Sequence, residues 1–220
     1  THFHPEHAAG EAGFPPETIL LRPAVQQQEM MEHGAELLAL FNRLNPEYAR
    51  LLRGVGKLRN PDVVFDHDLT LDLGGVTARL LWLGAGHTKG DELTLVEPDS
   101  TLVSGDIVQN KVVPGVAGQG GSFASWLTVL DKLEALHPRH VVPDHSHPGD
   151  GSLIAQERAF IIDMRSRALA LKKQGLPAAD AGKRLTADFQ SAYPEWARNP
   201  DWPNANSVAG FVREIYAEAK

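Results

Sequence analysis

The first seven residues, THFHPEH, hold three histidines and a glutamate, which are residue types that bind metal ions. His2 and His4 alternate, so on an extended segment their side chains share one face. Glu6 continues this alternation, and His7 follows it directly. Imidazole nitrogens and a carboxylate at this spacing suit a divalent metal such as zinc. A histidine run at a chain end can also be loose, so this run predicts a site only if the rest of the chain supplies partners.

Three later segments supply further candidate ligands, and each candidate follows an apolar stretch that is typical of a strand. His87 lies in GAGHTKGD (residues 84–91), Asp106 in LVSGDIV (102–108) and His145 in HVVPDHSHPGDG (140–151). Because α/β proteins build their sites at strand ends, we expect these three side chains to join the N-terminal histidines.

The glycines around His87 do not form a nucleotide-binding motif. Their spacing differs from GxGxxG, and the following segment, DELTLVEP, predicts a strand rather than a helix. Lys89 is followed by Gly90 and not by the serine or threonine of a P-loop. The sequence has no GxSxG segment and no cysteine, which excludes a serine nucleophile elbow, disulfides and thiolate metal ligands.

In their order along the chain, the four motifs resemble those of the metallo-β-lactamase superfamily. That family carries HxHxDH, then a histidine in a GHT-type loop, an aspartate in a GD segment and a histidine in a VPGH-type segment. The counterparts here are HFHPEH (2–7), GHTKGD (86–91), SGDIV (104–108) and VVPDHSH (141–147). The resemblance covers residues 1–150 and implies an α/β fold, the αββα sandwich.

The resemblance also implies a dinuclear site for two divalent metal ions, with Zn²⁺ as the first choice and iron or manganese as alternatives. His2, His4 and His87 would hold one ion. Glu6, His7 and His145 would hold the other, and Asp106 would bridge the two. Glu6 replaces the usual aspartate, and its extra methylene shifts or weakens the second position.

The family has several strands before HxHxDH, whereas only Thr1 precedes His2 here. We therefore expect a sandwich that lacks its N-terminal strands, with an open sheet edge, as in a chain whose upstream part has been removed.

The chemistry implied is metal-assisted hydrolysis of a small-molecule ester, thioester, lactone or amide, in which the metal ion acidifies a water molecule and polarises the substrate. The candidate catalytic residues are Glu6, which could orient that water, Asp106, through its bridging position, and His147, which follows His145 by two residues and could donate a proton.

Three alternatives stay open. Asp106 resembles the bridging aspartate of glyoxalase II and lactonase-like enzymes, while subclass B1 β-lactamases have a cysteine there and a lysine three residues later. Here Asp106 and Gln109 occupy these two places, which disfavours β-lactamase activity, but Lys111 is near. β-Lactamase activity therefore stays as the first alternative. A mononuclear iron enzyme similar to persulfide dioxygenases is the second, since a weakened second position fits a single metal. A non-catalytic metal-binding module is the third, and an open coordination position would argue against it.

The hydrophobic pattern predicts a core over residues 1–151 and a helical extension over 152–220 that packs on it. Within residues 62–108 we expect four strands, with turns at Gly74-Gly75 and at Pro98-Asp99-Ser100. The other expected elements are a buried strand at 18–21, a helix opened by Pro23, a short helix after Asn45-Pro46, a helix from near Ser122, a strand at 140–143, and helices at 152–174, 178–190 and 205–219.

Substrate contacts are expected from Trp126, Trp196 and Trp202, with packing of the helical extension as the alternative role of these side chains. The glycine-rich loop 113–121 has the composition of a mobile lid.

The composition fits a soluble globular protein, with 42% hydrophobic and 22% charged residues in 220. The net charge of -7 argues against a nucleic-acid partner, and no apolar run approaches the roughly 18 residues of a membrane span. A periplasmic or secreted location and a cytoplasmic one both stay open, as does the oligomeric state.

Overall fold

The computed structural model describes residues 1–44, 46–56, 58–116, 120–196 and 207–219. Its helices, in chain order, are α1 (Pro5–Ala8), the 3₁₀ helix η1 (Ala9–Gly13), α2 (Ala24–Leu44), α3 (Pro46–Leu51), α4 (Phe123–Glu134), α5 (Ser152–Lys173), α6 (Ala178–Ala192) and α7 (Val208–Glu218). Its strands are β1 (Leu21–Pro23), β2 (Val63–Phe65), β3 (Asp68–Asp72), β4 (Thr77–Trp82), β5 (Glu92–Glu97), β6 (Thr101–Gly105), β7 (His140–Pro143) and β8 (Gly149–Asp150).

The strands form two sheets. The larger has six strands in the order β3-β4-β5-β6-β7-β8, and the smaller pairs β1 with β2 in parallel. Among the described strand pairs of the large sheet, β6–β7 alone is parallel, and helix α4 lies between these two strands in the chain. Gly74 and Gly75 both have positive φ, which glycine adopts readily, and they close the predicted β3–β4 hairpin.

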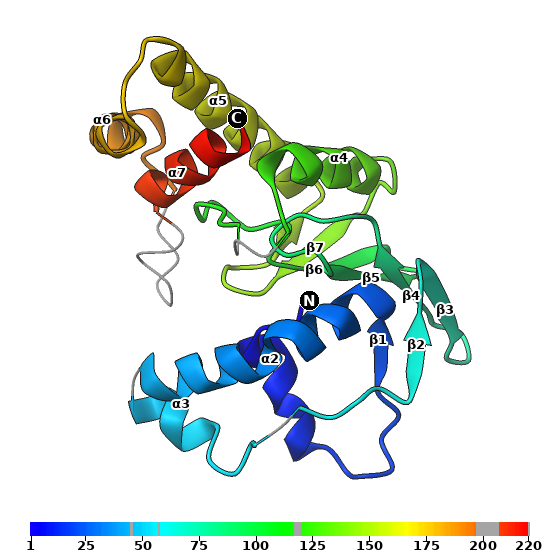
Figure 1. The fold of residues 1–220 in the computed structure, drawn as a ribbon. Helices are drawn as coiled ribbons and strands as arrows, with labels where there is room; N and C mark the ends of the chain where they lie inside the picture. Colours follow the sequence, from blue (N-terminus) through cyan, green and yellow to red (C-terminus); the bar gives the residue numbers. More distant parts are fainter. Residues whose placement is uncertain (45, 57, 117–119, 197–206, 220) are drawn as a thin grey trace.

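The large sheet lies between two groups of helices. Figure 1 shows α4, α5 and α7 on one side of it, and α2 with the small sheet on the other. Strands, α4 and the C-terminal helices share one hydrophobic cluster, whose fully buried side chains include Leu93, Leu102, Trp126, Phe160 and Phe211. The division of the chain at residue 151 stays a prediction, although residues on both sides of it build this common core.

A second, smaller cluster anchors the N-terminal segment. Phe3, between His2 and His4, is fully buried and belongs to the same cluster as Met30 and Phe41 of α2. The apolar face of α2 therefore fixes the backbone of the histidine run.

Most predicted elements are present within a few residues of their expected bounds, and two predictions are wrong. The first β-strand is Leu21–Pro23 rather than a buried strand at 18–21, because residues 15–18 form a turn in which Thr18 N–H donates to Pro15 C=O at 3.0 Å. The region 62–108 holds five strands rather than four, because Val63–Phe65 leaves the large sheet and pairs with β1.

Candidate metal centre

The N-terminal segment reaches the site beside the start of β5, where Glu92 N–H donates to Thr1 C=O at 2.7 Å. His4 then caps α1, with its carbonyl accepting from His7 N–H at 3.0 Å, and Pro5 occupies the first helical turn, where its fixed φ is suitable. The prediction that Glu6 continues an extended alternation is therefore wrong, because Glu6 and His7 stand on a helical turn.

His2, His4 and His87 come together as a group whose ligand atoms lie within 4.8 Å of one another. The ring centroid of His2 is 4.2 Å from that of His4 and 4.6 Å from that of His87. His2 is 1% exposed and His87 6% exposed, so this group is shielded from bulk water.

The loop that carries His87 is held by Asp91. The Asp91 carboxylate accepts from Gly86 N–H at 3.1 Å, and from the backbone N–H and hydroxyl of Thr88 at 3.0 and 2.8 Å. His87 Nδ1 lies 2.6 Å from Gly115 C=O. A carbonyl can only accept, so Nδ1 carries the proton and the lone pair of Nε2 is free to bind a metal.

Asp106 lies between the first histidine group and a second one. Its Oδ2 is 3.4 Å from His87 Nε2, and its Oδ1 is 3.3 Å from His145 Nε2 and 3.9 Å from His7 Nε2. Gln109 Nε2 donates to Asp106 Oδ1 at 3.1 Å, while Ser146 Oγ donates to Gln109 Oε1 at 2.8 Å. These hydrogen bonds tie the segment after β6 to the segment after β7 and orient the Asp106 carboxylate.

The second group consists of His7, Asp106, Asp144 and His145. His7 Nδ1 is 2.6 Å from Asp144 Oδ2, and this hydrogen bond is the main reason that the pKa of Asp144 is lowered. Pattern reasoning did not single out Asp144, Gln109 or Gly115 as contributors to the site. Asp144 could have been noticed as a carboxylate directly before a predicted ligand, but its contact with His7 has no local signature.

Glu6 is grouped with His2 and His7 rather than with His145. Its Oε1 lies 3.7 Å from His4 Nδ1, on the side of the first histidine group. The predicted placement of Glu6 at the second metal position stays a prediction, and the structure groups this carboxylate with one histidine of each position, His2 and His7.

The donor set fits divalent metal ions. Both ring nitrogens of His2, Nε2 of His7 and Nε2 of His87 are buried without a hydrogen-bond partner, which is costly unless another group binds them. Burial, assisted by the neighbouring imidazoles, lowers the pKa of His2 and of His4 well below the usual range. These two rings are therefore neutral at pH 7, which is the form that a metal ion requires.

The sequence also predicts substrate contacts from three tryptophans. Trp126 has no exposed surface and donates from Nε1 to Ile107 C=O at 2.9 Å, so its position fits the packing alternative. Trp196 stacks on Phe160 with ring centroids 4.0 Å apart and is partly buried against the core, and its contact with substrate stays a prediction. Trp202 lies outside the described residues.

His147 is exposed, and its carbonyl accepts from Asn110 Nδ2 at 3.1 Å. Its role as a proton donor stays a prediction. In the predicted lid, residues 113–115 are buried and residues 117–119 are outside the described part of the chain, so the described start of this segment is anchored rather than exposed.

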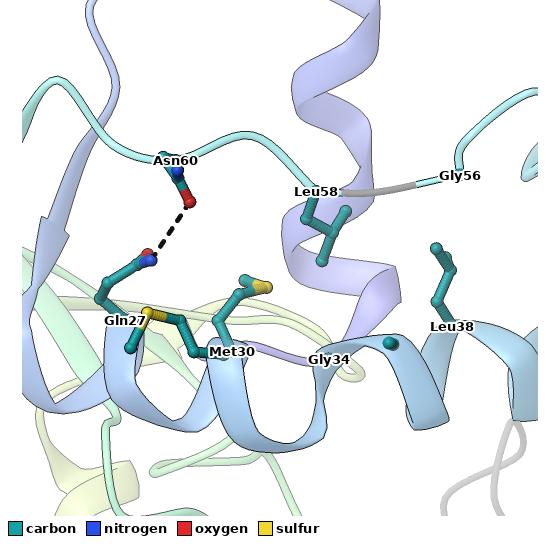
Figure 2. Close-up of a pocket in the computed structure, with 9 residues that line it drawn as sticks. Gln27, Met30, Gly34, Leu38, Gly56, Leu58 and Asn60 are labelled. Atoms are coloured by element: carbon teal, nitrogen blue, oxygen red, sulfur yellow. Dashed lines mark hydrogen bonds between the residues drawn. The ribbon is translucent and has the colours of Figure 1, made fainter.

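A separate cavity of about 450 Å³ lies between α2 and a segment that contributes Gly56, Leu58 and Asn60. Figure 2 shows Met30, Gly34 and Leu38 of α2 facing Leu58, with Gln27 hydrogen-bonded to Asn60 near one end. None of its lining residues belongs to the histidine groups. Among the described helices, none has the length and apolar character needed to cross a membrane.

Comparisons with known proteins agree on the fold. No protein-family model matches the chain. A curated relative, the metallo-beta-lactamase type 2 of Bacteroides fragilis, is 25% identical over 104 residues, which are 46% of this chain and 42% of the relative. The chain therefore matches less than half of that relative's length.

Two solved structures are similar over nearly all of the chain. A metallo-beta-lactamase family protein from Thermus thermophilus has a TM-score of 0.61 and 19% identity, covering 100% of this chain and 74% of that one. The stereoselective inverting sec-alkylsulfatase Pisa1 from Pseudomonas sp. has a TM-score of 0.66 and 16% identity, covering 99% and 40%. At such identities the likeness shows a shared fold, and the fold predicted from the four motifs is confirmed.

Proposed function

We propose that this chain, which has the metallo-β-lactamase fold, is a metal-dependent hydrolase of a small-molecule ester, thioester, lactone or amide. One observation carries the proposal: the Asp106 carboxylate lies within 3.4 Å of a nitrogen from each of two histidine groups. A carboxylate shared in this way is suited to bridge two cations. The curated relative named as a β-lactamase and the similar structure of an alkylsulfatase support hydrolytic chemistry without fixing the substrate.

In this proposal His2, His4 and His87 hold one ion, His7 and His145 hold the other, and Asp106 contacts both. Divalent ions bound there would supply Lewis-acid polarisation and a lowered pKa of a water molecule. The protein's own contribution is to orient the ligand side chains and to exclude bulk water from them. Gly115 and Asp91 fix the ring and loop of His87, and burial keeps competing water away from it.

Glu6 is placed to accept a hydrogen bond from a water molecule near the first histidine group, because its carboxylate faces His4 from that side. We assign it the role of orienting this water, beside the role as a ligand of the second ion that the resemblance implies. His147, exposed at the end of the segment after β7, is proposed as a proton donor to the leaving group.

The test begins with metal content per chain, measured by plasma mass spectrometry before and after chelation and reloading with zinc, iron or manganese. We expect about two zinc ions per chain and turnover of at least one member of a panel of esters, thioesters, lactones, amides, β-lactams and alkyl sulfates. His87→Ala should lose metal and turnover together. His140→Ala is the matched control, because His140 is exposed on β7, and it should retain both.

One iron ion per chain, with no second ion taken up on reloading, would favour the mononuclear oxygen chemistry instead. A chain that binds no metal after reconstitution would contradict the proposal, as would a fully loaded chain that hydrolyses no member of the panel.

A further inference from the structure

The contact between Asp144 and His7 joins the two chain segments that supply the second histidine group, helix α1 and the segment after β7. Asp144 follows β7 directly and precedes His145, while His7 stands on the helical turn α1. The His7 side chain is 1% exposed and the Asp144 side chain 43% exposed, so a partly solvated carboxylate reaches an imidazole inside the site. The distance of 2.6 Å from His7 Nδ1 to Asp144 Oδ2 is that of a short, charge-assisted hydrogen bond.

The two nitrogens of an imidazole point to nearly opposite sides of the ring. An ionised carboxylate only accepts, so the hydrogen bond with Asp144 requires the proton of neutral His7 to be on Nδ1. The lone pair then lies on Nε2, which is buried without a hydrogen-bond partner and stands 3.9 Å from Asp106 Oδ1. A metal ion held by Nε2 would thus be bound through the nitrogen that Asp144 does not contact.

We propose that Asp144 is a positioning residue for the second metal ion, because it holds His7 in the Nδ1–H tautomer and turns Nε2 toward Asp106 and His145. This inference rests on the proposed function, since it concerns the same metal centre. Proximity alone also groups Asp144 with the possible ligands, but its Oδ2 is already engaged with His7 Nδ1.

Asp144 is a departure from the family segment that this part of the chain resembles. The family segment that VVPDHSH resembles is of the VPGH type, with a glycine in the place of Asp144, and glycine has no side chain to accept this hydrogen bond. Glu6, which replaces the family's aspartate, lies near His4 and is grouped with His2 and His7. The chain thus places its extra carboxylate behind a ligand of the second ion, where it accepts a hydrogen bond from the Nδ1–H of that ligand.

Carboxylates behind metal-bound histidines commonly change metal affinity about 10- to 100-fold. We expect Asp144→Ala to weaken binding of the second zinc ion by about that factor and to leave the first zinc ion unchanged. Asp144→Asn keeps the shape of the side chain, but its amide can donate to Nδ1 as well as accept from it. We therefore expect it to lose the fixed Nδ1–H tautomer and to weaken the second zinc ion as well. Asp68→Ala, which removes an exposed carboxylate on β3, is the matched control and should change neither ion.

Two measurements test the inference. The first is ¹⁵N NMR of histidine-labelled, metal-free full-length chain, in which we expect His7 to be Nδ1-protonated in the wild type and a mixture of tautomers in Asp144→Ala. The second is titration of the chelated chain with zinc against a competing chromophoric chelator, which separates the two binding steps.

An unchanged His7 tautomer together with unchanged affinity for the second ion would overturn the inference while leaving the proposed function intact. Loss of the second ion with an unchanged tautomer would overturn it in favour of Asp144 as a direct ligand. Equal weakening of both ions would also overturn it. If the wild type binds no zinc, the proposed function fails, and the tautomer measured in the metal-free chain still decides whether Asp144 positions His7.

Discussion

Glu29 on α2 is expected to make the stability of the folded chain fall as pH rises from 5 to 8. Its side chain is 2% exposed, and Glu29 Oε1 accepts from Lys89 N–H at 3.0 Å, in the loop that carries His87. Burial is the largest cause of a pKa raised to about 7, against an ordinary value of 4.5, and the Lys89 N–H opposes it. The folded chain therefore binds more protons at Glu29 than the unfolded chain does between these two values.

The direction of this pH dependence follows from proton linkage. The free energy of unfolding falls with rising pH wherever the folded state binds more protons than the unfolded state. The contribution of Glu29 is fully present below the unfolded pKa and is lost as pH rises through the folded value near 7. The full shift corresponds to at most about 3.4 kcal/mol, of which about 2.5 kcal/mol falls between pH 5 and pH 8. Because relaxation and solvent screening reduce such values, we expect about 1–2 kcal/mol.

Glu29→Gln tests this reasoning because glutamine resembles the neutral carboxyl group and can still accept from Lys89 N–H. Urea unfolding of the metal-free chain at pH 5 and pH 8 gives the free energies of unfolding. Relative to the wild type, the variant should gain about 1–2 kcal/mol more at pH 8 than at pH 5. Glu32→Gln, one turn later on the same helix and half exposed, is the control and should show no such gain.

The same difference between variant and wild type at both pH values would refute the reasoning. It would mean that Glu29 is already ionised at pH 5 in the folded chain, and that Lys89 and Gly90 stabilise its charge more than burial disfavours it.

Two further predictions concern the packing around His87. Gly121→Ala would place a Cβ atom 2.3 Å from Gly86 O and 2.7 Å from His87 O, which are backbone atoms. The free energy of unfolding, measured in urea, should therefore fall by about 1–3 kcal/mol, and zinc titration should show weaker binding of the first zinc ion. An unchanged zinc affinity would show that the loop absorbs the clash. Trp126→Phe keeps an aromatic ring in the core but removes the Nε1–H donor to Ile107 C=O, and it should cost about 1–3 kcal/mol in the free energy of unfolding. Metal content should not change, since Trp126 is not one of the candidate metal ligands.

The sequence by itself determined the kind of fold and the candidate ligand types. Hydrophobic periodicity and turn residues are local properties, so the helices α2, α4, α5 and α6 and the β3–β4 hairpin were predictable without any tertiary contact. The four motifs pointed to one fold, which the comparisons bear out. They also named His2, His4 and His87 as a set, and the structure brings these three together.

Only the tertiary structure decided which carboxylate faces which histidine. Pro5 starts a helical turn that carries Glu6 toward His4, and the end of β7 meets that turn so that Asp144 reaches His7. Contacts of this kind depend on how distant segments pack, and neither residue type nor spacing encodes them. The raised pKa of Glu29 has the same origin, because burial against the His87 loop, and not the helix pattern around it, disfavours its charge.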